Sequence, residues 1–550
     1  MSIGARRAAR WSRLGAERFQ LLIIGGGIVG AGIARDAAMR GVRVALIEQG
    51  DFAGGTSSKT SKLIHGGLRY LEHGQLGLVA ESLRERHILR TIAPGLIHPL
   101  AILLPLYAGG SRRPAAVRVG LGIYDLLAGA HNVRPHRMLS ARRAVALEPK
   151  LRIDGLRAAG LYVDCLMDDA RVCLSNALQA ESFGAVCVNY VRVRALPRAD
   201  GRLAGAAIED TLTGRSQDVQ AEVVVNATGP WGDAIRRLSV PEARPRLAPS
   251  KGIHLIVPRL ADQALFLEAR DRRMIFLLPW HGYTLVGTTE SPVDGPLEDL
   301  AATGDDVAYL LDAVNDALPG SRIREADIIA TFAGARPLLA HSGPTTSASR
   351  EHQIDVDRHG LVSVLGGKFT TYRAMARQAV DRIAREQGWR LERCLTGDVS
   401  LIESPQPIGV VHWRELVQDI DGDMLARLLM RYGTGALRIL RMIEAEPGLG
   451  QRVCPHHEVL LAELAYGVLE ESACTMTDLL ARRTAIAWSS CQGLDLVSSA
   501  TDMLRRYGGL SAQDAQTETE AYMQFLARGL SFRPLLESGG VWAGAAEAEE

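Results

Sequence analysis

Cysteine is scarce in this chain, and neither sign of charge is in excess. Seven cysteines occur in 550 residues, an odd number scattered between Cys165 and Cys491. That number and spacing form no disulfide framework and suit a reducing compartment. The 63 basic and 62 acidic side chains leave a formal charge of +1, which argues against binding nucleic acid over the whole surface. The apolar fraction of 47% is too high for a wholly disordered chain.

A long uninterrupted apolar segment is also missing. The stretch 91–111 carries no formally charged residue, but three prolines interrupt it and argue against a transmembrane helix. Its part Leu100–Tyr107 predicts a buried strand instead. The segment 111–127 predicts a helix that begins at Pro114 and carries several arginines. Such a helix either lies in a membrane interface or packs on its own domain, and the sequence does not choose between the two.

The N-terminus lacks the features of a secretory signal. Its first 19 residues contain five arginines and one acid, Glu17, and the apolar run Leu21–Ile24 is too short for a signal-peptide core. We therefore expect residues 1–18 to form a disordered basic tail, with a short mitochondrial presequence as the alternative. Residues 536–550, which end in acids, are also expected to be a disordered tail.

The strongest local signal is a nucleotide-binding fingerprint near the start of the chain. An apolar strand from Phe19 is followed by Gly25, Gly27 and Gly30, a helical run, and a second strand that ends at Glu48. The first glycine allows a tight turn, the second lets the backbone approach a pyrophosphate, and the third allows close helix–strand packing. The helix N-terminus holds the anion, and Glu48 can accept hydrogen bonds from a ribose. This unit predicts dinucleotide binding without separating NAD from FAD.

Three later segments favour FAD. They are the small polar stretch Gly54–Lys62, the strand and turn Val223–Trp231, and the strand, glycine turn and helix start Leu361–Arg373. Each alone is compatible with an ordinary structural turn. FAD is long and needs several sheet ends to hold it, so the three segments beside a complete fingerprint predict an FAD site.

Six motifs then occur in an order that points to one family. They are Ser57–Glu72, Asn226–Trp231, Lys251–His254, Gly287–Glu290, Ala335–Leu338 and Gly366–Arg373. Together they closely resemble the FAD-dependent sn-glycerol-3-phosphate dehydrogenases of the aerobic, membrane-associated, quinone-reducing branch. The resemblance runs from about Phe19 to Arg373 and continues more weakly through Tyr466, Thr475, Asp478 and Arg482–Thr484.

The resemblance implies an α/β + α architecture with more than one domain, as a length above roughly 250–300 residues also requires. We expect a Rossmann-like FAD-binding domain of the glutathione-reductase/D-amino-acid-oxidase type, a mixed-sheet substrate domain and a C-terminal helical domain. The expected boundaries are 19–95, 150–235 and 330–395 for the FAD-binding domain, 96–149 and 236–329 for the substrate domain, and 400–535 for the helical cap. Ser404–Pro407 is the expected linker.

The resemblance also implies roles for individual residues. The expected catalytic residues are His254, Arg336, Lys368 and Glu290. The expected substrate-binding residues are Arg69, Tyr70, Arg336, Arg350 and Lys368. The expected cofactor-binding residues are Gly25, Gly27, Gly30, Glu48, Thr56, Ser57, Ser58, Ser61, Lys62, His65, Gly229, Gly367, Lys368, Thr370 and Thr371. One position departs from the family pattern, because Glu290 stands where the family has an aspartate.

The expected reaction requires residues of these types. Oxidation of a secondary alcohol by a flavin needs a group that takes the hydroxyl proton, and His254 is the candidate base. A nearby cation that stabilises the alkoxide is the alternative. The phosphate dianion requires several cations, which Arg69, Arg336, Arg350 and Lys368 can supply. His65 lies near the expected flavin ring, where covalent attachment, noncovalent contact and a buried hydrogen-bonded histidine are all possible.

The expected activity is oxidation of sn-glycerol 3-phosphate to dihydroxyacetone phosphate, with electrons passed to a membrane quinone. The implied partners are that substrate, the quinone and the inner-membrane lipid surface, with a homodimer possible and no nucleic acid. The expected location is the cytoplasmic face of the membrane, attached peripherally. An oxidase that uses oxygen and a noncatalytic FAD-binding module are the alternatives. No metal site is expected, because the cluster Cys454–His457 has no partner pair at zinc-finger spacing and is interpreted as a loop.

Overall fold

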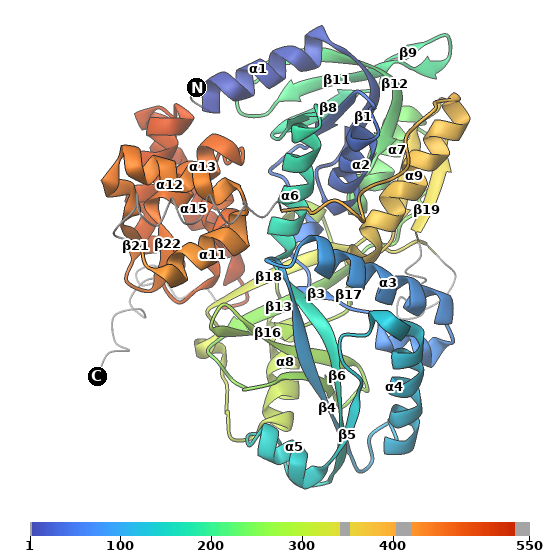
Figure 1. The fold of residues 1–550 in the computed structure, drawn as a ribbon, viewed down its shortest axis with the longest axis vertical. Coiled ribbons are helices and arrows are strands. Elements are labelled where there is room, and N and C mark those ends of the chain that lie inside the picture. Colours follow the sequence, from blue (N-terminus) through green and yellow to red (C-terminus); the bar gives the residue numbers. More distant parts are fainter. Residues whose placement is uncertain (1–2, 341–351, 403–419, 534–550) are drawn as a thin grey trace.

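The computed structural model describes residues 3–340, 352–402 and 420–533. Two sheets and a helical domain form the three parts of the molecule (Figure 1). The two sheets lie one above the other in this view, and the helical domain, coloured orange to red, lies beside them. Ser404–Pro407, residues 536–550 and Arg350 fall outside the described residues.

The first sheet is the predicted nucleotide-binding sheet. Its central order is β19-β20-β12-β1-β2-β7, with β11 beside β12 and β8 beside β11. Strands β20, β12, β1, β2 and β7 run parallel. The strand bounds are β1 (Arg18–Ile24), β2 (Val44–Ile47), β7 (Val186–Val188), β8 (Val191–Ala195), β11 (Gly205–Asp210), β12 (Ser216–Asn226), β19 (His352–Val356) and β20 (Val362–Gly366).

Helices cover this sheet because its strands are apolar on both faces, as is usual for parallel sheets. Helix α2 packs against both α6 and α9, and their alanine-rich faces join the strand side chains in one buried core. The helix bounds are α2 (Ile28–Met39), α6 (Asp169–Ser182), α7 (Gly232–Ser239) and α9 (Tyr372–Gln387). A small hairpin, β9 (Arg198–Ala199) and β10 (Arg202–Leu203), projects from the edge.

The second sheet is mixed and corresponds to the expected substrate domain. Its order is β17-β13-β16-β15-β14-β4-β6-β3, with β18 beside β13 and β5 beside β6. The strand bounds are β3 (Leu63–Ile64), β4 (Ile97–Tyr107), β5 (Arg137–Ser140), β6 (Leu156–Met167), β13 (Ser250–Val257), β14 (Ala264–Glu268), β15 (Met274–Trp280), β16 (Tyr283–Gly287), β17 (Ser291–Pro292) and β18 (Ala330–Arg336). Around it lie α3 (Leu76–Ile92), α4 (Pro114–Ala128), α5 (Ala141–Leu147) and α8 (Gly304–Ala317).

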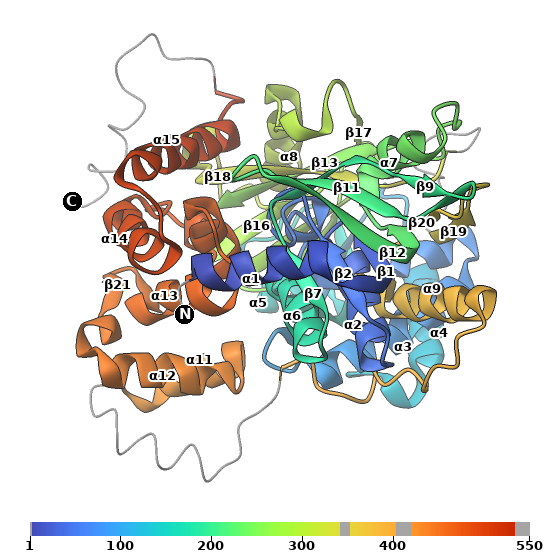
Figure 2. The ribbon, with the colours of Figure 1, turned by 90° about the horizontal axis from the view of Figure 1, so that it is seen from above.

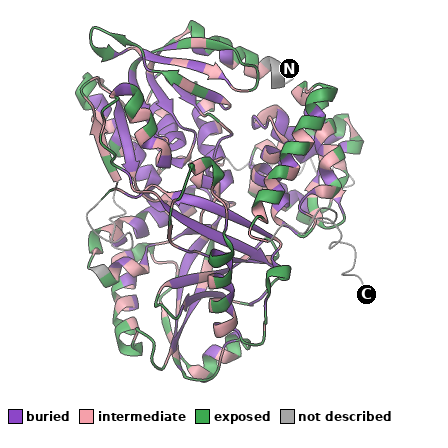
Figure 3. Cartoon of the chain, turned by 180° about the vertical axis from the view of Figure 1, so that it is seen from behind, coloured by how far each residue is buried: buried purple, intermediate pink, exposed green. Residues whose placement is uncertain are grey.

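The proline-interrupted apolar stretch forms the predicted strand. Along β4, Leu103 packs into one core of the substrate domain, while Ile102 and Leu104 pack into the core on the other face. A strand buried on both faces explains the absence of charge. No described helix is long and apolar enough to cross a membrane. Figure 3 shows buried residues concentrated in the strands of both sheets, with exposed residues on the outer helices.

The C-terminal domain is helical, as expected. Its elements are α11 (Gly422–Tyr432), α12 (Gly435–Ala445), β21 (Arg452–Cys454), β22 (His457–Leu460), α13 (Leu461–Glu470), α14 (Val497–Met503) and α15 (Ala512–Gly529). They share their own hydrophobic core. The cluster at Cys454–His457, interpreted from the sequence as a loop, instead ends one strand and begins the next in an antiparallel hairpin.

The N-terminal segment differs from the expectation of a disordered tail. Residues Ile3–Ala16 form helix α1, which lies along the nucleotide-binding sheet and reaches toward the helical domain (Figure 2). Trp11 and Leu14 are buried. Arg7 Nη2 donates to Asp210 Oδ1 at 3.0 Å, and Arg6 Nη1 donates to Glu470 Oε2 at 2.7 Å. The arginines are therefore ion-pair partners that tie the helix to both domains.

The domain boundaries also differ from the expected ones. Strand β6, residues 156–167, pairs along β4 in the substrate sheet, so the chain returns to the nucleotide-binding domain at α6 and not near residue 150. Strand β18, residues 330–336, pairs with β13 in the substrate sheet, so the final return comes after it. An apolar strand of this length fits either sheet, and its partner cannot be identified from its own composition.

Candidate active site

A single large cavity joins the expected cofactor and substrate residues. It has a volume of about 940 Å³ and lies among the nucleotide-binding sheet, the substrate sheet and the helical domain. Its lining includes Glu48 and Val191 from the first sheet, His254 from the second sheet and Lys368 from the turn after β20. A cavity of this size with convergent polar groups is suited to a large cofactor and a small substrate.

The glycines at the nucleotide end have the geometry that the fingerprint predicts. Gly25 has a φ of +109°, which only glycine adopts readily. Gly27 precedes helix α2 and faces Ser57, whose Oγ accepts a hydrogen bond from the Ile28 N–H at 2.9 Å. A Cβ on Gly30 would lie 1.9 Å from the Gly25 carbonyl oxygen. This tight turn and open helix N-terminus form a cradle for a pyrophosphate.

Glu48 lies at the end of β2 and faces the cavity. Its carboxylate accepts hydrogen bonds from the backbone N–H groups of Gly26 at 2.6 Å and Gly50 at 2.9 Å. Burial raises the pKa of Glu48, although these N–H groups act in the opposite direction. The donors hold the carboxylate at the wall of the cavity, where a ribose diol would lie.

His254 lines the cavity from β13. Its Nε2 lies 2.8 Å from Ser61 Oγ, and its ring stacks on Phe332 with 4.9 Å between centroids. A Cβ on Gly287 would lie 2.3 Å from the imidazole, so the neighbouring strand must have glycine there. Burial, with the charges of Arg336 and Lys62, lowers the pKa of His254 well below its usual value. The imidazole is therefore neutral and able to accept a proton.

Arg336 lies beside His254 at the end of β18. Its Nη2 donates to Thr288 Oγ1 at 2.8 Å and to the Thr289 carbonyl at 2.9 Å. A Cβ on Gly252 would lie 2.3 Å from this Nη2, so glycine is required for the guanidinium to cross the strand. These contacts fix a positive charge at the cavity wall.

The cavity is also lined by Lys368, Tyr70, Arg69 and Glu290. The Lys368 ammonium lies 3.7 Å from the centroid of the Tyr70 ring, a cation–π contact between two chain segments that the sequence analysis placed in the substrate site. Buried Glu290 Oε1 has no hydrogen-bond partner among the described residues. An acceptor of this kind calls for a donor from a ligand or water.

Most of the expected site residues line the cavity, but some do not. Those that line it are Gly25, Gly27, Glu48, Thr56, Ser57, Ser61, His65, Arg69, Tyr70, Gly229, His254, Glu290, Arg336, Gly367, Lys368 and Thr370. Gly30, Ser58, Lys62 and Thr371 are not part of the lining. The Lys62 ammonium is instead buried against Asp169 Oδ1 and the Ser58 carbonyl, each at 2.7 Å. Thr371 precedes helix α9 and donates to the Lys368 carbonyl.

Asp164 is a site residue that sequence reasoning missed. It lies in β6, lines the cavity and is 2% exposed. Its Oδ1 accepts hydrogen bonds from Arg86 Nη1 at 2.5 Å and Tyr124 Oη at 2.6 Å, and from the Gly66 N–H at 3.3 Å. These contacts position the backbone next to His65. The signal was a lone carboxylate inside the apolar strand Leu156–Met167.

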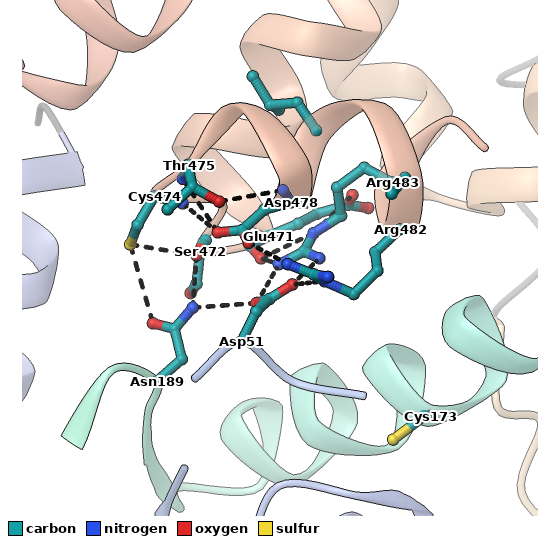
Figure 4. Close-up of polar contacts among 12 residues, drawn as sticks. Asp51, Cys173, Asn189, Glu471, Ser472, Cys474, Thr475, Asp478, Arg482 and Arg483 are labelled. Carbon is teal, nitrogen blue, oxygen red and sulfur yellow. Dashed lines mark hydrogen bonds and ion pairs between the residues drawn. The ribbon is translucent and has the colours of Figure 1, made fainter. Parts of the chain in front are cut away.

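A second missed group links the cavity to the helical domain. Asp51 follows β2 and accepts hydrogen bonds from Arg482 Nε at 2.6 Å and from Arg483 Nη1 at 2.7 Å (Figure 4). Asn189 Nδ2 donates to the same carboxylate at 3.1 Å. Burial alone would raise the pKa of Asp51, but the two guanidinium groups hold it below the usual value. Arg482 also lines the cavity, so this ionic cluster fixes one of its walls.

Family comparison agrees with this geometry. The model described as FAD dependent oxidoreductase matches residues 20–382, and that described as C-terminal domain of alpha-glycerophosphate oxidase matches residues 364–515. The fold and the cofactor cradle thus define an FAD-dependent oxidoreductase. Residues from Gly25 to Ser57 and from Gly367 to Thr370 would hold FAD along the cavity.

Individual relatives identify the family within this class of oxidoreductases. Glycerol-3-phosphate dehydrogenase 2 of Mycobacterium tuberculosis is 38% identical over 528 residues, covering 94% of this chain and 90% of the relative. The aerobic glycerol-3-phosphate dehydrogenase of Bacillus subtilis is 37% identical, covering 85% and 87%. The structure of glycerol-3-phosphate dehydrogenase from Bacillus halodurans, complexed with FAD, matches with a TM-score of 0.81 at 28% identity, covering 98% of this chain and 100% of that chain. The chain belongs to the FAD-dependent glycerol-3-phosphate dehydrogenase family.

Proposed function

We propose that this chain oxidises sn-glycerol 3-phosphate to dihydroxyacetone phosphate and that its electrons pass to a membrane quinone. The observation that carries the proposal is that Arg336, Lys368 and Arg69 line the same cavity as a neutral, buried histidine, His254. A small phosphorylated alcohol needs both features, cations for the phosphate and an acceptor for the hydroxyl proton.

The phosphate would lie against the cations. Arg336 is held by Thr288 and Thr289, so it presents its charge without further ordering on binding. Lys368 adds a second positive charge from the glycine turn after β20. Arg350 stays a prediction for this subsite.

The hydroxyl would lie near His254. When bound, FAD supplies the acceptor for the hydride that leaves the carbinol carbon. His254 takes the hydroxyl proton on its neutral imidazole, and Ser61 fixes the ring orientation through the 2.8 Å contact with Nε2. Arg336 stabilises the negative charge that develops on the substrate oxygen. Glu290 remains a proposed polar contact to the substrate, supported by its open acceptor oxygen.

Quinones dissolve in lipid, so the proposed acceptor requires attachment to a membrane. Helix α4 supports this, because Val119, Ile123 and Leu126 are exposed at i, i+4 and i+7 on one face. Arg118 in α4 and Arg113 directly before it are exposed. Arg112, another arginine of the segment 111–127, instead pairs with Glu72 and Glu268. We propose peripheral attachment to the cytoplasmic membrane face through α4.

Anaerobic titration tests the proposed chemistry. Adding sn-glycerol 3-phosphate to the FAD-containing protein should bleach the flavin absorbance, and a quinone analogue should restore it faster than oxygen does. Peroxide formed at a rate equal to substrate oxidation would favour the oxidase alternative. A flavin that glycerol 3-phosphate does not bleach would favour the noncatalytic module. Acid precipitation tests whether FAD is covalently attached to His65. FAD that is not covalently attached is released and colours the supernatant yellow.

A further inference from the structure

Cys454, His457 and Cys491 come together in the C-terminal domain, away from the cavity lining. Cys454 and His457 are directly paired across the β21–β22 hairpin, and Cys491 lies in the loop before α14. One ligand atom from each residue lies within 4.8 Å of the other two. The Cys491 sulfur is 3.4 Å from His457 Nε2. Among the described residues, these three side chains offer two thiol sulfurs and one imidazole nitrogen as possible metal ligands.

The geometry of the group matches the needs of a tetrahedral cation. Zinc bonds of about 2.3 Å to sulfur and about 2.05 Å to nitrogen put tetrahedral S and N ligands about 3.6 Å apart, close to the observed separation. The backbone N–H groups of His456 and His457 point at the Cys454 sulfur, and such donors stabilise a metal-bound thiolate. The short hairpin therefore presents a Cys-x-x-His pair whose cysteine sulfur already has supporting donors. Ser489 Oγ lies 2.9 Å from His457 Nε2, and a bound ion would take its place on that nitrogen.

We propose that Cys454, His457 and Cys491 form a binding site for a soft divalent cation of the zinc class. Cys454 is buried, while His457 and Cys491 are half-buried, so an ion can enter from the surface. Three protein ligands leave a fourth position for water. Thiolate with imidazole selects zinc over magnesium or calcium.

An ion at this site would fix a loop that supports the catalytic end of the cavity. Trp488 lies three residues before Cys491, and its ring is 5.5 Å from that of Phe332, which stacks on His254. Gln492 Nε2 donates to the Ile329 carbonyl at 2.7 Å. Joining Cys491 to the β21–β22 hairpin therefore anchors the loop that crosses from the helical domain to the substrate sheet.

The test uses the full-length FAD-containing protein, treated with chelator and reductant and then titrated with zinc or cadmium chloride. We expect one zinc bound per chain, a cadmium–thiolate charge-transfer band in the ultraviolet, and a Tm that rises with zinc concentration because the ion binds the folded state. Cys491→Ser and His457→Gln should each lower zinc affinity at least tenfold and weaken the Tm shift. The matched control is Cys394→Ser, which removes another half-buried free cysteine and should bind zinc like the unsubstituted protein.

Two results would overturn the proposal. One is zinc stoichiometry and cadmium absorbance in Cys491→Ser equal to those of the Cys394→Ser control. The other is absence of zinc binding to the reduced protein, with Cys454 and Cys491 forming a disulfide on exposure to air, which would make the pair a redox site. If Cys491→Ser fails to fold, the His457→Gln variant gives the same comparison.

Discussion

Nε2 of His254 lies 2.8 Å from Oγ of Ser61, although the two residues are 193 positions apart in the sequence. Ser61 comes from the segment that follows the nucleotide fingerprint, and His254 comes from the substrate sheet. The contact fixes the orientation of the imidazole at the cavity wall. It also leaves buried Nδ1 without a hydrogen-bond partner among the described residues.

His254→Ala should slow anaerobic flavin reduction by glycerol 3-phosphate by about 10²- to 10⁴-fold, the usual contribution of a positioned base. Stopped-flow absorbance of the flavin measures this rate. Ser61→Ala keeps the histidine and removes only the group that orients it, so its loss should be about tenfold or less. FAD content must be equal in both variants. Near-normal reduction by His254→Ala across the pH range would remove histidine from the mechanism.

Arg336→Ala should raise the KM for glycerol 3-phosphate by about 10- to 100-fold, as expected for loss of charge-assisted hydrogen bonds of about 1.5–3 kcal/mol. The KM for glycerol, which has no phosphate, should change little. Loss of alkoxide stabilisation, or of support for Thr288 and Thr289, would lower turnover of both substrates, so the ratio of their two KM values is what measures phosphate binding. Equal losses on both substrates would contradict a phosphate-binding role.

The sequence is most informative where function restricts the backbone. Gly25, Gly252 and Gly287 are required by a turn or by a side chain packed on them, and all three lie in motifs that the sequence analysis used. The strand Leu100–Tyr107 also follows from its apolar pattern, and the helical C-terminal domain follows from the family resemblance. These features depend on local geometry, which local sequence encodes.

Contacts between residues far apart in the sequence could not be predicted in the same way. The arginines of α1 look like a basic tail until Asp210 and Glu470 are placed beside them. Lys62 looks like a cofactor ligand, but Asp169 neutralises it. Strand β6 fits either sheet by composition, and pairing with β4 decides its domain. In each case the deciding contact comes from a residue that is distant in the sequence.

Asp51→Asn should reduce the free energy of unfolding by up to about 3–5 kcal/mol, because it removes the carboxylate that two buried guanidinium groups share. Among the described carboxylates, Arg482 then keeps only Asp478, and Arg483 keeps only Glu471. Arg483 is 1% exposed and both of its Nη atoms bond Asp51. Urea unfolding of the FAD-containing protein measures the loss. Asp398→Asn breaks the exposed pair with Arg393 and should cost less than about 1 kcal/mol. Equal stability of the two variants would show that the Asp51 cluster (Figure 4) does not hold the domains together.

Paired substitutions Val119→Glu and Leu126→Glu on α4 should abolish binding to vesicles of anionic phospholipid. These side chains are 63% and 79% exposed, and α4 lies on the side of the substrate domain opposite the helical domain (Figures 1 and 2). Co-sedimentation with vesicles measures the effect. Leu212→Glu, an exposed leucine elsewhere, is the control and should bind like the unsubstituted protein. Unchanged sedimentation of the α4 double variant would exclude this helix as the attachment surface.

Glu181 links α1 to the first domain and should make the free energy of unfolding depend on pH. Burial raises its pKa from 4.5 to about 7, although Arg10 Nε lies 2.8 Å from the carboxylate. Between these two values the folded protein holds a proton that the unfolded chain releases, so the stabilising contribution of Glu181 is lost as pH rises. Relative to Glu181→Gln, the unsubstituted protein should therefore lose up to about 1.4 kcal/mol per pH unit from pH 4.5 to about 7 and then level off.

Chemical denaturation of both proteins at several pH values measures this difference. Glu386→Gln, which changes an exposed glutamate paired with Arg382, is the matched control and should follow the unsubstituted protein. A difference between Glu181→Gln and the unsubstituted protein that stays constant across pH 4.5–7 would show that Glu181 is ionised throughout. The Arg10 ion pair would then outweigh the cost of burial, and α1 would be held more tightly at neutral pH than we expect.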